Sequence, residues 1–458
     1  MGGCVKRGFS NRADLVIAIL LPAAFALAGW KVLGRLPAAE YVSLPPSALT
    51  LPMAGPDTTN TAPRPPRVAD GPLRYDTKFV SAAPGQAVHA ASLVELKDGR
   101  LRAVWFSGSR EGAGDVTIQT AVLDREGRQW GLESTLFDRP QIERSLIRYV
   151  KKLGNPVIAR APDGTLMLWL VTVSLGGWAG SSIIWSRSSD DGVSWTGPQR
   201  LVTSPFLNIS TLVKAMPVAL VDGQMALPVY HEFVTKFAEI LRIDAAGRVT
   251  DKVRIPGSQK SLQPVLLPDN ARRANVYMRS TGIPAVMTSA TADAGRTWSV
   301  TEAGQLPNPD SALAGLVTDR GTKWLALNPI TAGRNTLAVF QEENNSFQGS
   351  ATWTVESPAG AQPALSRHDY GALLASELKE NSLSSLQVQD YVASAMRQLC
   401  RDDRCAQEFS YPYLLQSRDG SIHLVYTWHR TRIKHVTFNP LQPAILEKLK
   451  TPHGRNTE

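Results

Sequence analysis

Short apolar segments separated by tight turns repeat along the chain from residue 73 onward. In each repeat an apolar run leads into Asp-Gly or a similar pair, and a second apolar run follows. The turns lie at Asp98-Gly99, Asp163-Gly164, Asp222-Gly223, Asp269-Asn270, Arg320-Gly321 and Asp419-Gly420. Asp-Gly between alternating apolar residues is a strong hairpin signal, because both turn positions need a positive φ. The pattern therefore predicts six β-hairpins.

The hairpins recur at a nearly regular interval. Their turns lie about 47–65 residues apart, except for a last gap of about 99 residues. A small sheet cannot bury its apolar face alone, and a ring of such sheets leaves only short exposed edges. The spacing predicts an all-β fold, a six-bladed β-propeller spanning residues 73–445.

The last gap has a different periodicity. Between residues 360 and 407 the apolar positions recur at steps of three and four, which predicts one or two helices inserted before the last hairpin. Such an insertion either covers the mouth of the propeller or is an inert surface addition.

The N-terminus carries an export signal or a membrane anchor. Lys6, Arg7 and Arg12 precede an apolar run of 16 residues, Leu15 to Trp30. Basic residues before such a run keep that end in the cytoplasm, so the rest of the chain crosses the membrane. Residues 1–36 are therefore either an uncleaved anchor or a cleavable signal peptide, for which Ala26-Leu27-Ala28 has the small-x-small form that a signal peptidase recognises. A Pro-rich, solvated linker is expected at 37–72 and a tail at 446–458.

This topology places the main domain in the cell envelope. It would face the periplasm or the exterior from an inner-membrane anchor, or be secreted if the signal is cleaved. In that oxidising space Cys400 and Cys405, two of the three cysteines, could form a short loop disulfide.

Composition narrows the classes of partner. Hydrophobic residues make up 43% of the chain and charged residues 19%, which excludes wholesale disorder. The formal net charge of +9 favours anionic partners, but no Lys/Arg-rich run indicates nucleic acid. The sequence contains no metal-ligand spacing, phosphate loop or nucleotide fingerprint, so no cofactor is expected, although loop carboxylates could hold calcium.

A second repeat is more specific. Residues 188–195 fit the pattern S-x-D-x-G-x-x-W, residues 291–298 fit it with Thr for Ser, and residues 124–130 carry a degenerate trace. In this pattern the Asp accepts turn N–H groups, the Gly takes a positive φ and the Trp packs under the loop. The repeat resembles the Asp box, or bacterial neuraminidase repeat, of sialidases. The resemblance runs from Phe79 to His435 and implies a structural role for these boxes.

Several further segments resemble a sialidase-like bacterial branch, with polar residues at strand ends facing the mouth. Sialidases use a Tyr nucleophile with a Glu partner, an Asp acid/base and three arginines on the substrate carboxylate, for which a planar guanidinium is suited. The resemblance implies Tyr411 as nucleophile, Glu232 as its partner and Asp115 or Glu111 as acid/base. It implies these substrate-binding residues: Arg279 and Arg430, then Arg334 and Arg110, with His89, His231, Asn155, Lys214 and Asn308.

One departure concerns the first blade. Sialidases carry an Arg-Ile-Pro motif there, whereas this chain has no arginine and places His89 at that point. The Arg-Ile-Pro at 254–256 lies between blades three and four. A histidine binds a carboxylate well only when protonated, so binding through His89 would weaken above about pH 6.5.

Two classes of function follow. The first is a glycoside hydrolase acting on an acidic sugar or envelope glycan. The second is a non-catalytic acidic-glycan-binding propeller in polysaccharide or envelope assembly. An enzyme needs at least two of Glu111, Asp115 and Glu232 near Tyr411, whereas a binding protein needs only the arginines and aromatic residues.

Overall fold

The computed structural model describes residues 12–33, 39–42, 76–124, 126–127, 129–204, 208–358, 364–379 and 383–439. The described residues divide into two compact units, one within residues 1–39 and the other within residues 40–458. The first unit contains α1 (Arg12–Leu33), with Pro22 inside it. Among the described helices, none combines the length and the apolarity that a bilayer crossing requires. The expected tail and most of the expected linker lie outside the described residues.

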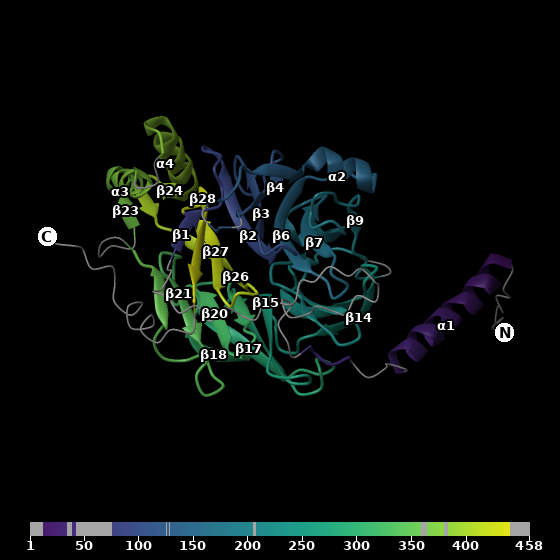
Figure 1. The fold of residues 1–458 in the computed structure, drawn as a ribbon. Helices are drawn as coiled ribbons and strands as arrows, with labels where there is room; N and C mark the ends of the chain where they lie inside the picture. Colours follow the sequence, from purple (N-terminus) through teal and green to yellow (C-terminus); the bar gives the residue numbers. More distant parts are fainter. Residues whose placement is uncertain are drawn as a thin grey trace, which may run out of the picture. The chain divides into compact units, whose positions relative to one another are not determined.

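The second unit is built from β-sheet (Figure 1). Its described residues form six sheets of four or five strands and one small sheet of three. The first of the six consists of β2 (Ala87–Glu95), β3 (Leu101–Gly108), β4 (Thr117–Val122) and β5 (Ser134–Phe137). The second contains β6 (Lys152–Arg160), β7 (Leu166–Val173), β8 (Ser181–Ser188) and β9 (Gln199–Arg200). The third contains β10 (Leu212–Val213), β11 (Val218–Ala219), β12 (Met225–His231), β13 (Phe237–Ile243) and β14 (Val249–Arg254).

The remaining large sheets follow the same antiparallel order. The fourth contains β15 (Ser261–Pro268), β16 (Ala274–Ser280), β17 (Ala285–Thr291) and β18 (Glu302–Pro307). The fifth contains β19 (Ala314–Val317), β20 (Lys323–Leu327), β21 (Leu337–Gln341) and β22 (Trp353–Glu356). The sixth combines β26 (Phe409–Gln416), β27 (Ile422–Trp428) and β28 (Arg432–Phe438) with β1 (Asp76–Phe79), so the two ends of the domain share one sheet.

The first strands of neighbouring sheets contact one another in sequence, except that the third sheet contacts the fourth through β12. Strand β2 contacts β6 and β26, β10 contacts β6, β12 contacts β15, and β19 contacts both β15 and β26. These contacts close into a cycle. The second strands supply the largest fully buried side chains, namely Trp105, Trp169, Trp324 and Trp428. Large aromatic side chains fit the half-buried surface of a sheet, which explains much of the tryptophan content.

The six predicted hairpins are confirmed. Each predicted turn joins two neighbouring antiparallel strands at the start of a sheet, as at Asp98-Gly99 between β2 and β3; in the third sheet the turn joins the short β11 to β12. The turn glycines take a positive φ, for example 86° at Gly99 and 84° at Gly420. All six turns therefore lie at the same end of the ring of first strands.

The two intact Asp boxes join the third strand of a sheet to the fourth. In the second box Asp293 accepts hydrogen bonds from the Thr297 amide at 2.9 Å and from the Thr291 hydroxyl at 2.8 Å. The Gly295 amide donates to the Thr291 hydroxyl at 3.0 Å, and Trp298 is buried beneath the loop. The box at 188–195 repeats these contacts through Asp190, so both boxes are structural clasps.

We expect Asp293→Ala to lower the free energy of unfolding by about 1 kcal/mol, because the turn amides lose their acceptor. Urea unfolding would measure the change. Glu302→Ala, which removes an exposed carboxylate from the adjoining strand β18, is the matched control and should change stability little. Equal stability of the two variants would contradict a clasp role for Asp293.

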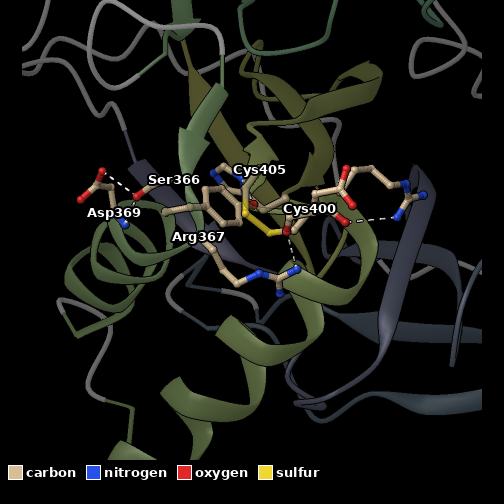
Figure 2. The surroundings of a disulfide bond; sticks show 9 residues. Ser366, Arg367, Asp369, Cys400 and Cys405 are labelled. Atoms are coloured by element: carbon tan, nitrogen blue, oxygen red, sulfur yellow. Dashed lines mark hydrogen bonds between the residues drawn. A yellow bond between two sulfur atoms is a disulfide. The ribbon is translucent and has the colours of Figure 1, made fainter.

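The predicted helical insertion is confirmed. It contains α3 (Arg367–Lys379) and α4 (Ser385–Leu399), with a small sheet of β23 (Ala364–Ser366), β24 (Cys400–Arg401) and β25 (Arg404–Ala406). The Cys400–Cys405 disulfide, which the sequence left open, links β24 to β25 beside the start of α3 (Figure 2).

The insertion packs on loops of the sixth and first sheets. The Gln398 side chain donates to the Ser109 carbonyl at 3.1 Å, and the Tyr391 hydroxyl donates to the Ala82 carbonyl at 2.8 Å. The Tyr370 hydroxyl bonds the buried His429 ring at 2.9 Å. Since Ser109 begins the turn that contains Glu111, the insertion supports that turn and is not an inert addition.

Other connections are short. Helix α2 (Arg139–Leu146) follows β5 and begins with a capping box at Asp138. A 3-10 turn, η2 (Trp178–Gly180), precedes β8.

Part of the expected linker lies against the domain. Tyr41 is 1% exposed, and its amide donates to the Ala271 carbonyl at 2.8 Å. The Val42 amide donates to the Ala219 carbonyl at 3.0 Å. At these residues the segment is an ordered extension of the domain and not a solvated tether, because a tyrosine side chain is buried and two backbone amides find partners there.

Candidate functional site

A backbone kink recurs in the first strands of four sheets. The first strands of four sheets carry a residue with positive φ at a shift of register: Ala90, Asn155, Gln263 and Tyr411, with φ of 56°, 43°, 51° and 54°. Non-glycine residues seldom adopt this conformation, and it persists only where packing imposes it. A bulge also re-aims a side chain out of the regular alternation. Three of the four kinked residues carry hydrogen-bonding side chains.

The Tyr411 hydroxyl is the meeting point of this cluster. It accepts hydrogen bonds from Gln263 Nε2 at 3.2 Å and from Arg279 Nη1 at 3.3 Å. Arg279 extends from β16 and also pairs through Nε with Asp310 Oδ1 at 2.9 Å. Burial disfavours the charged Arg279, but Tyr411, Asp310 and Tyr230 together raise the pKa of its guanidinium. Arg279 is therefore a permanent cation against the Tyr411 oxygen.

A second tyrosine shares these contacts. Tyr230, at the end of β12, accepts hydrogen bonds from Gln263 Nε2 at 3.3 Å and from Asn155 Nδ2 at 3.2 Å. Burial raises the pKa of the Tyr230 phenol well above its usual value, so this side chain stays protonated. Four sheets thus contribute one residue each to the network, namely Asn155, Tyr230, Gln263 and Tyr411.

Two further arginines meet at one buried carboxylate. Arg430 Nε donates to Glu408 Oε1 at 2.7 Å, and Arg334 Nη1 reaches the same oxygen at 3.5 Å. Ser410 donates to it as well, at 2.5 Å. Burial alone would raise the pKa of the Glu408 carboxyl, but Arg430 and Arg334 hold it below its usual value. Glu408 is therefore an anion that fixes both arginines beside Tyr411, whose ring lies 5.8 Å from the Arg334 guanidinium.

His89 is neutral in this environment, which corrects the expectation of a protonated carboxylate ligand. Its ring centroid lies 4.0 Å from that of Tyr411, and its Nδ1 bonds Thr427 Oγ1 at 2.8 Å. Burial lowers the pKa of the imidazole well below its usual value, and four cations lower it further: Arg430, Arg334, Lys214 and Arg279. His89 adds no charge to the site, and the loss of binding expected above about pH 6.5 does not follow from it.

Lys214 lies close to the ring of Tyr411. Its Nζ is 5.6 Å from the centroids of the Tyr411 and Tyr413 rings and donates to the Pro412 carbonyl at 3.3 Å. Burial lowers the pKa of its ammonium to about 7. It therefore supports the kinked segment that carries Tyr411.

The buried Lys214 makes stability depend on pH. Its pKa is lower in the folded than in the unfolded protein, so the folded state binds fewer protons between about pH 7 and 10.5 and stability rises with pH across that window. We expect Lys214→Met to be more stable than wild type at pH 6, and the difference to shrink by about 2 kcal/mol at pH 9. Urea unfolding at both pH values measures this, and a constant difference would contradict it.

The three candidate carboxyls differ in their surroundings. Glu111 is exposed and pairs with Arg430 Nη1 at 2.8 Å, which links it to the cluster. Burial raises the pKa of the Glu232 carboxyl, which interacts electrostatically with Arg279 and Glu111. Asp115 instead accepts hydrogen bonds from the Ser109 amide and hydroxyl within its own turn, at 3.1 and 3.0 Å. The structure thus connects Glu111 and Glu232 to the site and gives Asp115 a turn-capping contact.

The remaining candidates have structural contacts. His231 bonds Glu239 at 2.7 Å and stacks on Phe237, where the paired strands β12 and β13 meet at their ends. Asn308 is fully buried and bonds the backbone of Ser311, so it shapes the loop that carries Asp310. Arg110 is exposed in the turn that contains Glu111.

Sequence reasoning missed Gln263 as the partner of Tyr411, together with Tyr230 and Glu408. Among the described residues, no hydrogen bond joins Glu232 to Tyr411. The side-chain amide of Gln263 bonds the Tyr411 hydroxyl instead. A local signal existed, because a proline follows each of three kinked residues, at Asn155-Pro156, Gln263-Pro264 and Tyr411-Pro412.

A separate cavity of about 100 Å³ lies on the turn side of this cluster. It shares Lys214 and Pro412 with the cluster and is otherwise lined mainly by apolar residues of β11, β15, β19 and β26, with Val42 at its wall. Because it contains none of the arginines or candidate carboxyls, it is distinct from the candidate site. Among the described residues there is also no group of three His, Cys, Asp or Glu side chains arranged to hold a metal ion.

Comparison with known proteins agrees with this architecture. The family model described as BNR repeat-like domain matches residues 99–424. No curated protein matches the chain. Among solved structures, the Hadza microbial sialidase Hz136 superposes with a TM-score of 0.58 at 13% identity, over 77% of this chain and 66% of that one, just under two thirds of its length.

For two further solved structures, the match spans nearly the whole length of the other protein. A protein of unknown function from Dyadobacter fermentans gives a TM-score of 0.56 at 11% identity, over 80% of this chain and 99% of that one. The intramolecular trans-sialidase from Ruminococcus gnavus, solved with oseltamivir carboxylate, gives 0.54 at 12% identity, over 82% and 96%. At these identities the likeness shows a sialidase-like, all-β fold.

Proposed function

The chain belongs to the BNR repeat-like domain family, and from this premise we propose that it is a glycoside hydrolase that acts on an acidic sugar. The observation that carries the proposal is the convergence of three arginines, Arg279, Arg334 and Arg430, together with Lys214, on the buried His89 and Tyr411. Guanidinium groups bind carboxylates through two parallel hydrogen bonds, and a buried cationic site attracts anions. The cycle of six sheets is proposed to be the six-bladed propeller expected from the sequence.

In the proposed reaction Arg279, Arg334 and Arg430 hold the sugar carboxylate. The Tyr411 oxygen forms a bond to the anomeric carbon while the glycosidic C–O bond breaks, and Glu111 or Asp115, in its protonated carboxylic-acid form, gives a proton to the departing oxygen. The Tyr411 proton passes to Glu232, because burial raises the pKa of this carboxyl and so makes its carboxylate a stronger base. Water then hydrolyses the glycosyl-tyrosine intermediate. Gln263 cannot take this proton, because an amide is not a base.

The same amide favours a second candidate function. Gln263, and not a carboxylate, contacts the Tyr411 hydroxyl, and Arg430 and Arg334 are already paired with Glu408. A non-catalytic propeller that binds acidic glycans needs no proton acceptor at this place. It would use the same arginines without turnover.

The test is a panel of sialylated and uronic-acid glycans with their neutral counterparts. Release of reducing sugar from an acidic glycan, and not from the neutral one, supports the hydrolase. Calorimetric binding without release supports the binding protein. Neither binding nor release of any acidic glycan contradicts both functions.

The location in the cell envelope is part of the proposal. Lys6, Arg7 and Arg12 before the apolar run support export through an anchor or a cleaved signal. A reporter that is active only after export, fused behind residue 458, should be active, and activity of a cytoplasm-only reporter at that position would contradict it.

A further inference from the structure

The orientation of the Gln263 amide is fixed by its neighbour. Arg279 has only N–H donors, so its 3.1 Å contact must be with the Gln263 carbonyl oxygen, Oε1. This leaves Gln263 Nε2 facing the two phenols, with one hydrogen for Tyr411 at 3.2 Å and one for Tyr230 at 3.3 Å. Gln263 is thus an obligatory donor to both hydroxyl oxygens.

The Tyr230 oxygen is surrounded by donors. Besides Gln263, Asn155 Nδ2 donates to it at 3.2 Å. These two N–H groups occupy both lone pairs of the hydroxyl. Within the part of the chain that the structure describes, no acceptor takes the proton of the Tyr230 hydroxyl. Tyr230 is 2% exposed, and a buried donor without an acceptor is unfavourable.

Three other buried tyrosines of this domain do not share this feature. The Tyr413 hydroxyl donates to the Ile158 carbonyl at 3.3 Å, and the Tyr391 hydroxyl donates to the Ala82 carbonyl at 2.8 Å. Tyr370 bonds the His429 ring at 2.9 Å. Tyr230 therefore differs from tyrosines that serve packing alone. It also lies where residues from the first strands of several sheets meet.

We propose that Tyr230 is a second ligand-binding tyrosine, which donates its hydroxyl proton to an anionic oxygen of the sugar bound beside Tyr411. Gln263 and Asn155 are its positioning residues, since they fill the other side of the oxygen and direct the O–H group towards the ligand. This inference rests on the proposed acidic-sugar site and adds to it a neutral donor. A neutral O–H donor can bind an anionic oxygen of the ligand while Arg334 and Arg430 stay paired with Glu408.

The test uses Tyr230→Phe, which removes one oxygen atom. Calorimetry measures the binding of sialic acid and glucuronic acid, each with its methyl ester, to wild type and variant. We expect the affinity of the variant for the acids to fall about tenfold and its affinity for the esters to fall less, because a hydrogen bond to a charged group is stronger than one to a neutral group. The preference for acid over ester should therefore shrink.

Tyr413→Phe is the matched control, because it removes the hydroxyl of a buried tyrosine that has an acceptor. It should lower the melting temperature and leave the preference for acid over ester unchanged. An unchanged preference in Tyr230→Phe would overturn the role of Tyr230 alone. Wild-type protein that binds neither acid more tightly than its ester would overturn this inference and the proposed acidic-sugar site together.

Discussion

Arg279→Ala is expected to weaken the binding of an acidic sugar by about 100-fold or more. Removing one partner of a buried charge pair typically costs about 2–5 kcal/mol, and here the ligand carboxylate would lose its cation. The same change leaves Asp310 without its partner, so a carboxylate would face the incoming anion. Calorimetry with sialic acid measures the loss.

Arg248→Ala provides the control. Arg248 also pairs with an aspartate, Asp244, but its side chain is 79% exposed on a turn of the third sheet. Exposed pairs contribute little, so this variant should bind like wild type. Equal affinity of the two alanine variants would remove Arg279 from the carboxylate site.

Tyr411→Phe is expected to lower turnover of an acidic glycan by about 10³-fold or more, with a much smaller change in KM. The variant keeps the aromatic ring that packs on His89 and loses only the oxygen that contacts Gln263 and Arg279. Initial rates over a range of substrate concentrations separate the two constants. Turnover within about tenfold of wild type would exclude Tyr411 as nucleophile.

Tyr277→Phe is a matched control on the fourth sheet. Tyr277 is a buried tyrosine whose ring packs on Phe347 in an apolar cluster. Its loss of one hydroxyl should affect stability and leave turnover unchanged. If Tyr277→Phe lowered turnover as much as Tyr411→Phe, the loss of any buried hydroxyl would slow the reaction, and the effect at Tyr411 would not identify it as the nucleophile.

Local features of the fold could be predicted from the sequence because neighbouring residues determine them. The Asp98-Gly99 turn, the Asp293 clasp and the helices of the insertion each depend on contacts within a few residues. Their physical causes, a positive φ, a carboxylate that accepts turn amides, and a 3.6-residue period, are visible in short windows.

The partners inside the site could not be predicted in this way. Gln263 lies 148 residues before Tyr411 in the chain. The chemistry of a tyrosine nucleophile instead pointed to a carboxylate partner, Glu232. Only the shared kinks of the first strands bring Gln263 to the phenol. The prolines after Asn155, Gln263 and Tyr411 were the available signal, but nothing local shows that they mark equivalent positions.

The charge of His89 also depends on the assembled site. An isolated histidine is half protonated near pH 6.5, and the sequence supported a charged ligand on that basis. In the fold, burial and converging cations remove the proton. Glu408 is the reverse case, since a buried carboxylate with no obvious motif stays ionised because Arg334 and Arg430 meet at it.

A crystal structure with bound sialic acid tests the central claim most directly. The expected result places the sugar carboxylate within about 3 Å of guanidinium nitrogens of Arg279, Arg334 and Arg430, with the anomeric carbon facing the Tyr411 oxygen. A carboxylate directed to solvent, or a sugar bound in the apolar cavity behind Lys214, would contradict the account.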